Sequence, residues 1–164
     1  ELSRYQRFVG NSNRVLLWQG APLTSWLSIL VQGPRPPPKE APESGYTFGK
    51  GLYLFNAARA ALAKGGSTFL LLAEVALGSS RQLSEPEKGA DKLPPGFLSL
   101  RAAGAKSPET SCEHRLIDGT AVHVPAGPLQ EVQGSCWGQY DEFVVFNPAQ
   151  LRMRYLVEVQ DVPK

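Results

Sequence analysis

The chain contains little cysteine, no long apolar run and almost no excess of charge, and each of these absences removes a class of protein. Two cysteines, Cys112 and Cys136, are typical of free thiols in a reducing compartment. One disulfide between them is allowed by their number, but nothing in the pattern supports it. No apolar run is long enough to cross a bilayer. The net charge of +2 offers no electrostatic case for binding to nucleic acid or to a membrane surface.

The sequence also lacks an initiator methionine and a basic-then-apolar leader, so we expect an excised domain. Its 164 residues, with 42% hydrophobic content, are enough for one well-filled core. We therefore expect a single domain over residues 1–164. The 14 prolines and 16 glycines predict long connections between its elements.

The first elements are predicted from apolar patterning and end signals. A short apolar run predicts a buried strand over 15–18. A helix is expected over 24–32, with Thr24 or Ser25 as its N-cap and Gly33 in the left-handed conformation that ends it.

The middle of the chain begins with a proline-rich segment over 33–44, which we expect to be an extended surface loop because proline fixes φ and lacks an amide donor. A glycine-broken segment then leads into a strand over 51–55. Asn56 is placed to cap an alanine-rich helix over 57–64, which Gly65-Gly66 would end.

The second half is predicted to consist of strands and a long loop. The apolar run over 68–77 is typical of a central strand covered on both faces. Residues 78–138 are expected to be mostly loop, with one strand at 120–125. Strands follow over 142–147 and 151–159, and in the last of these alternate apolar residues share one face while Arg152 and Arg154 share the solvated one. The fold class is α+β.

Five segments of the chain carry a resemblance to a known family. They are RVLLWQG, GYTFGKGLYLF, LLLAEVALG, DKLPPGFLSLRAAG and QYDEFVVFNPAQLRMRYLVEV. In this order and spacing the chain resembles the catalytic domain of the poly(ADP-ribose) polymerases, with most likeness to the nuclear, DNA-dependent members. The resemblance covers nearly the whole chain. It implies the ADP-ribosyltransferase fold, a pair of antiparallel sheets around a cleft for NAD with short flanking helices.

The same resemblance implies a truncated domain in the nucleus. The family's first strand and its upstream helical regulatory domain have no counterpart before Glu1. A protein partner or a protein acceptor is implied, whereas the domain itself shows no signal for nucleic acid.

ADP-ribose transfer breaks the nicotinamide–ribose bond through an oxocarbenium-like state, which a carboxylate at the ribose can stabilise. The resemblance places Glu142 in this catalytic role. It also makes Gly20 the residue whose backbone holds the nicotinamide carboxamide, Tyr53 a ring that stacks on the nicotinamide, and Arg35 a contact at the adenosine end. From residue type and position alone, without the resemblance, Glu142 would be interpreted as a solvated residue at a strand end and Tyr53 as an inward-facing core residue.

The departures from the family pattern gather at the nicotinamide end. Gln19 replaces the histidine that orients the dinucleotide, Ala21 and Ala61 replace two serines around the carboxamide, and Lys64 replaces the second stacking tyrosine. Phe55 stands where the family has a small residue, and its ring would fill the space that the ligand needs. The sequence therefore predicts a pseudoenzyme that acts as an interaction module, with NAD as its substrate only if it is active. The alternative is a transferase that attaches single ADP-ribose units through Glu142.

Other candidate sites have weaker support. Cys112, His114, His123 and Cys136 fall in one region, but their spacing matches no compact zinc pattern, so no metal is expected. No third group orients a cysteine–histidine nucleophile pair. Gly49 and Gly51 precede a predicted strand. A phosphate-binding loop needs a helix N-terminus after its glycines, so this segment is not expected to be one.

Overall fold

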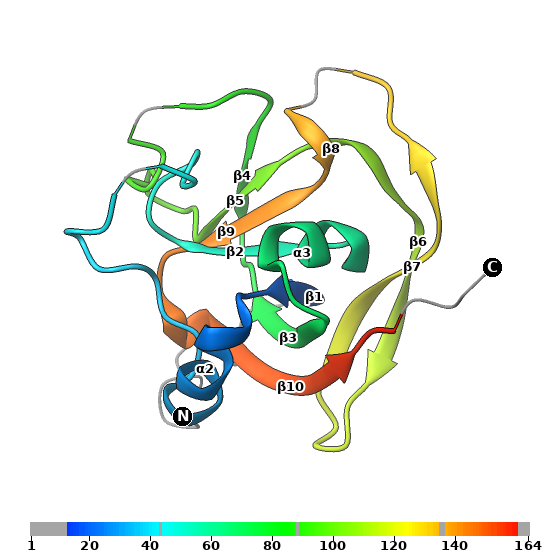
Figure 1. The fold of residues 1–164 in the computed structure, drawn as a ribbon. Coiled ribbons are helices and arrows are strands. Elements are labelled where there is room, and N and C mark those ends of the chain that lie inside the picture. Colours follow the sequence, from blue (N-terminus) through cyan, green and yellow to red (C-terminus); the bar gives the residue numbers. More distant parts are fainter. Residues whose placement is uncertain (1–12, 43, 88, 135–136, 161–164) are drawn as a thin grey trace.

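The computed structural model describes residues 13–42, 44–87, 89–134 and 137–160. Strands dominate the molecule, and its helices are short (Figure 1). In chain order the elements are β1 (Arg14–Gly20), η2 (Leu23–Ser25), α2 (Trp26–Gln32), β2 (Leu52–Phe55), α3 (Ala58–Gly65), β3 (Phe69–Ala76), β4 (Ser80–Leu83), β5 (Ser99–Ala102), β6 (Gly104–Arg115), β7 (Ala121–Glu131), β8 (Gly138–Tyr140), β9 (Glu142–Val145), η3 (Pro148–Gln150) and β10 (Leu151–Glu158).

The described strands form one ten-stranded sheet that branches at β1. Its main path is β4-β5-β9-β2-β1-β7-β6-β8, while β3 pairs with β1 and β10 pairs with β3. Two antiparallel arms, β3–β10 and β2–β9–β5, meet at β1. Parallel pairing occurs between β4 and β5, between β1 and β7, and between β6 and β8. The predicted α+β class is confirmed.

Strand β1 separates two apolar clusters, because successive side chains of a strand point to opposite faces. Leu17 belongs to the larger cluster, which also contains Trp26 of α2. Trp18 packs against the second cluster, which includes Phe55 of β2 and Ala61 of α3. Helix α3 therefore covers the face of the sheet on which Phe55 lies, and this arrangement positions the site described below.

The helix ends are partly as predicted. Gly66 ends α3 in the left-handed conformation, with φ 65° and ψ 20°, as predicted. Gly33 also ends α2 with a positive φ of 78°, but its ψ of 160° lies outside the left-handed helical region that was expected.

Of the expected N-caps, Ser25 is confirmed in position, since it is the N-cap of α2, although its side chain makes no capping bond. The expected cap at Asn56 is wrong, because Ala57 is the N-cap of α3. The amide nitrogen of Asn56 donates to Asp141, while its Oδ1, the atom that would cap a helix, is buried with no hydrogen-bond partner among the described residues.

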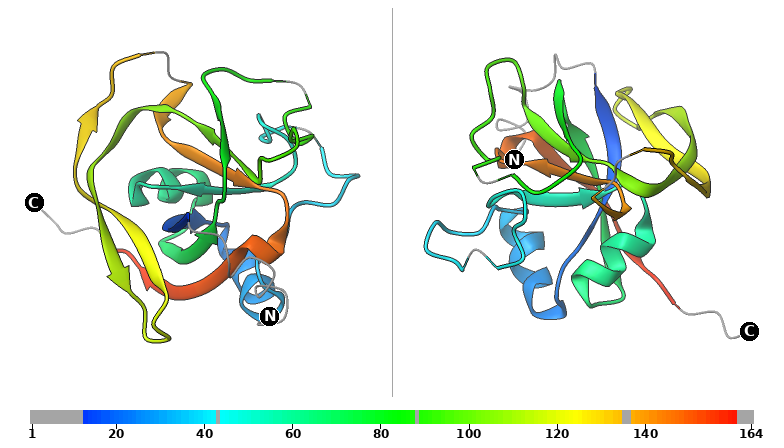
Figure 2. Two further views of the ribbon diagram at one scale, coloured as in Figure 1. Left: turned by 180° about the vertical axis from the view of Figure 1, so that it is seen from behind. Right: turned by 90° about the horizontal axis from the view of Figure 1, so that it is seen from above.

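The expectation of a long loop over 78–138 is wrong, because this region holds β4, β5, β6, β7 and β8. The β6–β7 hairpin runs as a long curved ribbon along one edge of the molecule (Figures 1 and 2). Most of its side chains are exposed or half-buried, so it lacks the apolar alternation that marks a strand in sequence.

The alternation predicted for β10 is interrupted. An irregularity in its pairing with β3 lies between Met153 and Tyr155, so Met153 packs on the core while Tyr155 is 44% exposed. A bulge shifts the side-chain period by one residue. Arg154 consequently does not lie on a fully solvated face, and it pairs with the fully buried Glu74 of β3.

The proline-rich segment forms neither helix nor strand over 33–42, as predicted. None of the helices in the described residues is long and apolar enough to cross a membrane.

Candidate functional site

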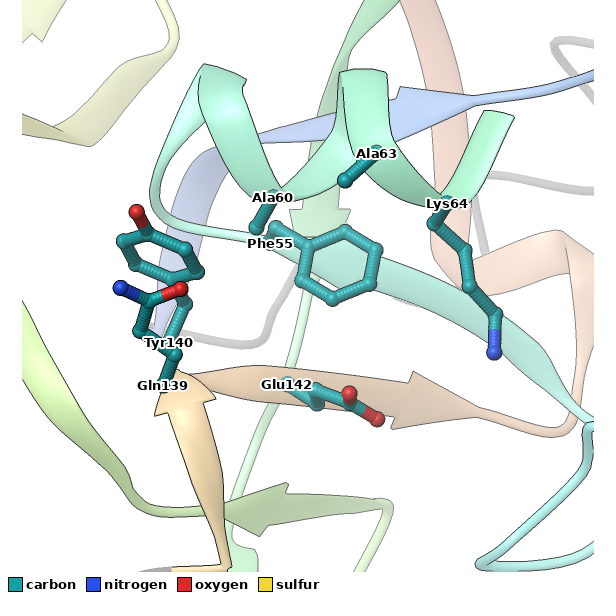
Figure 3. A pocket seen from close by; sticks show the side chains of 7 residues that line it. All are labelled: Phe55, Ala60, Ala63, Lys64, Gln139, Tyr140 and Glu142. Carbon is teal, nitrogen blue, oxygen red and sulfur yellow. The ribbon is translucent and has the colours of Figure 1, made fainter. Parts of the chain in front are cut away.

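A cavity of about 320 Å³ opens between α3 and the β2–β9 strand pair (Figure 3). Its floor is apolar and its rim carries an acid, an ammonium and an amide. The lining residues are Phe55, Ala60, Ala63, Lys64, Gln139, Tyr140 and Glu142. The volume lies near the lower end of the roughly 300–1,000 Å³ that pockets for drug-sized ligands occupy.

Glu142 reaches this cavity because it opens β9. It stands directly opposite Phe55 of β2 and Ala102 of β5 in the sheet register. Opposed residues of an antiparallel pair project to the same face, so the acid and the phenyl ring share one side of the sheet. Figure 3 shows the Phe55 ring between α3 and the Glu142 carboxylate.

The residue before Glu142 anchors the start of β9. Asp141 is 1% exposed, and its Oδ1 accepts from the Gly104 backbone N at 2.7 Å. Its Oδ2 accepts from Asn56 Nδ2 at 2.9 Å, Arg101 NH2 at 2.8 Å and Ser107 Oγ at 3.3 Å. A buried carboxylate satisfied by four donors from neighbouring segments fixes the backbone on which Glu142 stands.

The charge of Glu142 is disfavoured by its surroundings. Burial raises the pKa of its carboxyl, and the positive charge of Lys64 offsets part of that rise. Acids with a raised pKa are frequent at functional sites, although burial alone also produces them.

Tyr53 is 8% exposed, and its hydroxyl holds the loop that precedes β2. The hydroxyl accepts from the Phe48 backbone N and donates to the Gly49 carbonyl, both at 2.9 Å. Burial raises the pKa of Tyr53 to about 12, with a smaller contribution from the charge of Glu142. The phenol therefore has a structural task independent of any ligand.

Lys64, in the last turn of α3, lies over the ring of Tyr53. Its Nζ is 5.5 Å from the ring centroid and donates to the Gly45 carbonyl at 3.2 Å. An ammonium at this distance from an aromatic face makes a cation–π contact. The side chain also lines the cavity that Glu142 enters, so one face of Tyr53 is occupied by a charge of the protein itself.

Gly20 ends β1 against α3. A Cβ on this residue would overlap the carbonyl oxygen of Ala61, and one on Gly65 would lie 2.7 Å from the Gly20 Cα. These two glycines therefore allow the strand and the helix to approach closely. Gly20 is not among the residues that line the cavity.

The remaining expected contacts lie elsewhere. Gln19 does not line the cavity, and its Oε1 is buried with no hydrogen-bond partner in the described part of the chain. Arg35 is exposed in the proline-rich loop and also lies outside the lining. Among the five residues predicted for the site, Glu142 lines the cavity and Tyr53 adjoins it through Lys64.

Sequence reasoning missed several parts of the site. Ala60 and Ala63 share the helix face of Lys64, a spacing of three and four residues that could have indicated them. Gln139 and Tyr140 lie just before Glu142 in the last of the five segments that carry the resemblance. Only the folded chain shows that they line the cavity beside α3. No signal in the sequence distinguished the buried Asp141.

The possible metal ligands do not gather in the described residues, where no group of three or more His, Cys, Asp or Glu side chains could hold an ion. His123 stands opposite Glu113 and Cys112 opposite Val124 in the β6–β7 hairpin. Cys136 lies outside the described residues.

Comparison with known proteins matches this chain, over residues 1–161, to the family model described as the poly(ADP-ribose) polymerase catalytic domain. It is 42% identical to poly [ADP-ribose] polymerase 2 of Arabidopsis thaliana over 98% of this chain and 26% of the relative. It is 38% identical to poly [ADP-ribose] polymerase 2 of Homo sapiens over 90% of this chain and 27% of the relative. For poly [ADP-ribose] polymerase 1 of Xenopus laevis the identity is 36%, over 98% of this chain and 16% of the relative. The chain thus spans about a quarter or less of these relatives.

Proposed function

Since the chain belongs to the poly(ADP-ribose) polymerase catalytic-domain family, whose members are ADP-ribosyltransferases that use NAD, we propose that it is a member with lost or very weak NAD cleavage that acts as an interaction module. This proposal concerns the domain described here. Any statement about the activity or the partners of a longer protein that contains this domain is part of the same proposal.

The family reaction requires the nicotinamide ring to sit with its ribose bond beside the catalytic acid. The C–N bond to the ribose breaks, nicotinamide leaves with the electron pair, and an acceptor nucleophile bonds to the ribose carbon. A carboxylate contributes to such a transition state only when the substrate is held in register beside it. Glu142 supplies the carboxylate, so the question is whether a ring can be seated next to it.

The observation that carries the proposal is the position of Phe55 directly opposite Glu142. The ring is 4% exposed and packs with Ala60 and Ala61 of α3. It takes up part of the cavity wall beside the acid, and core packing leaves it little room to move. Lys64 occupies the adjoining face of Tyr53 in the same way.

The lost polar contacts support the same conclusion. Ala21 and Ala61 are buried methyl groups at the positions where the family has serines. Each missing donor to a buried ligand group costs on the order of 1–3 kcal/mol, so two losses weaken binding by roughly a hundredfold or more. Gln19 does not line the cavity, so its buried Oε1 provides no contact there in place of the lost ones.

An exposed apolar surface supports the interaction role. Four large apolar side chains of the η2–α2 segment are between 46% and 76% exposed: Leu23, Leu27, Leu30 and Val31. Their spacing of three and four residues places them on one face of the segment, and large exposed apolar patches mark contacts with other proteins. We propose a protein partner on these grounds, and a nuclear location from the family resemblance alone.

Thermal unfolding with and without ligand tests the proposal. A ligand that binds only the folded chain at a hundred times its Kd stabilises it by about 2.7 kcal/mol. We expect no shift with millimolar NAD or with a benzamide-type mimic of nicotinamide. A clear shift with both ligands, abolished by filling the cavity through Ala60→Phe, would show that the nicotinamide site is intact and would overturn the proposal.

The alternative is an active transferase that attaches single ADP-ribose units to protein side chains. The observation in its favour is that Glu142 enters an open cavity on an anchored strand. Incorporation of label from NAD that disappears in Glu142→Ala would establish this alternative.

A further inference from the structure

Lys64 and Glu142 carry opposite charges that face one cavity without meeting. The ammonium extends from the last turn of α3 and the carboxylate from the start of β9, and Figure 3 shows both beside the Phe55 ring. No ion pair joins the two to each other, or either of them to another of the described residues. A gap therefore separates the two charges, and both side chains line the space between them.

The contacts that the two groups make do not neutralise them. Lys64 Nζ donates to the Gly45 carbonyl at 3.2 Å and lies 5.5 Å from the Tyr53 ring centroid, and both of these partners are uncharged. The half-buried Glu142 carboxylate accepts no hydrogen bond within the described part of the chain. Burial raises the pKa of this carboxyl, and the charge of Lys64 offsets only part of that rise. Each group would therefore gain from a partner of opposite charge.

The surface between the two charges is apolar. Phe55 and Ala60 are buried in the wall of the cavity, and Ala63 lines it from the same helix as Lys64. The volume of about 320 Å³ is small for a ligand pocket and suits a molecule with few non-hydrogen atoms. The complementary ligand has a cationic group for the acid, an anionic group for the ammonium and an apolar body.

A free α-amino acid with an aliphatic side chain has all three features. Its ammonium and its carboxylate are both charged at neutral pH, and one carbon atom carries them together with the side chain. We propose that the cavity binds such an amino acid, with its ammonium at Glu142, its carboxylate at Lys64 and its side chain against Phe55 and Ala63. This inference rests on the proposed function, because it names a ligand for a site that does not cleave NAD.

A nuclear magnetic resonance titration of the full chain with L-leucine tests the proposal. We expect a Kd of roughly 1 mM or lower. N-acetyl-leucine lacks the ammonium and leucinamide lacks the carboxylate, so each should bind at least about tenfold more weakly. Glycine keeps both charges without the apolar side chain, and it should also lose at least about tenfold in affinity. This series uses the parent chain, so it does not depend on the folding of any variant.

Substitutions at the two charges give an independent test. Lys64→Met and Glu142→Gln should each weaken binding of L-leucine at least about tenfold, while Lys64→Arg keeps the charge and should stay within about threefold of the parent. Lys92→Met and Glu85→Gln are the matched controls, because both residues are exposed and lie outside the lining of the cavity. Both controls should leave the Kd within about twofold.

Three results would each overturn the inference: no binding of L-leucine, equal binding of its acetyl and amide derivatives, or an unchanged Kd in Lys64→Met. None of these results bears on NAD cleavage. The proposed function fails separately, if transfer from labelled NAD⁺ occurs and depends on Glu142.

Discussion

Phe55 and Glu142 stand directly opposite each other in the β2–β9 pair, with the phenyl ring between the acid and α3. The ring therefore takes up part of the space beside the acid, and a cavity of about 320 Å³ remains between α3 and the β2–β9 pair. We propose that two further features add to this effect: the ammonium of Lys64 over Tyr53, and the buried Ala21 and Ala61 at positions where the family resemblance places serines.

Reopening the site should restore binding of a nicotinamide mimic. We expect the combination of Phe55→Ala, Gln19→His, Ala21→Ser and Ala61→Ser to gain a thermal shift with benzamide that the parent chain lacks. Removing a buried phenyl ring costs about 3–5 kcal/mol, so each variant must be compared with itself in the absence of ligand. Absence of any shift in the folded quadruple variant would mean that the ring and the missing hydroxyls are not what closes the site.

Tyr53→Phe should destabilise the fold through lost hydrogen bonds. The phenol accepts from the Phe48 amide and donates to the Gly49 carbonyl, and its removal leaves both buried backbone groups without this partner. We expect a loss of about 1–3 kcal/mol in the free energy of unfolding, measured with denaturant. Tyr155→Phe, at a 44% exposed position, is the control and should be nearly neutral. Equal effects of the two changes would contradict the structural role of Tyr53.

Gly20→Ala should be poorly tolerated because the added methyl would overlap the Ala61 carbonyl. The obstacle is helix backbone, which cannot rotate away, so we expect a loss of about 1–3 kcal/mol or more. Gly138→Ala adds a methyl with no atom within 4 Å and serves as the control. Thermal unfolding of the two variants provides the comparison, and a fully stable Gly20→Ala would argue against the close packing of β1 on α3.

Glu74→Gln should be strongly destabilising. Glu74 is fully buried in β3 and pairs with Arg14 at 3.4 Å and with Arg154 of β10. Removing one member of a buried pair costs about 3–5 kcal/mol, because the remaining charge loses compensation. Glu87→Gln breaks the more exposed pair with Arg81 and should cost less than about 1 kcal/mol. Chemical denaturation measures the free energy of unfolding of both variants. Similar losses for the two would contradict a stabilising role for the buried Glu74 pairs.

Glu142→Gln should stabilise the fold at neutral pH. Burial raises the pKa of Glu142, so the folded chain holds its proton more tightly than the unfolded chain does. Stability therefore falls as the pH rises from the ordinary glutamate pKa through the raised one, and this cost is fully present above both. We expect a higher Tm for the variant at pH 7, and the difference should vanish below the ordinary pKa. The exposed Glu85→Gln provides the control, and a lower Tm for Glu142→Gln at pH 7 would contradict the direction of the shift.

The elements that the sequence predicted well bury one or both faces. Strand β3 is apolar over most of its length, and the glycines at 33 and 66 end their helices as expected. The β6–β7 hairpin could not be predicted because most of its residues are exposed or half-buried, which leaves no apolar period to read. The bulge in β10 is also invisible locally, since it depends on pairing with β3.

The site shows the same limit. A resemblance could identify Glu142, Phe55 and Lys64, but their mutual positions depend on pairing between strands that are far apart in sequence. Asn56 is a good helix cap by its type, yet its amide donates to Asp141 in the fold. Helix α3 begins one residue later, with Ala57 as its N-cap, and the Asn56 Oδ1 that would cap it has no partner among the described residues.

Transfer of radiolabel from NAD⁺ to protein, measured for the parent chain beside Glu142→Ala, addresses the central claim most directly. The account predicts the same background counts for both. Label that accumulates with time on the parent chain or an added acceptor, and is absent with Glu142→Ala, would contradict it.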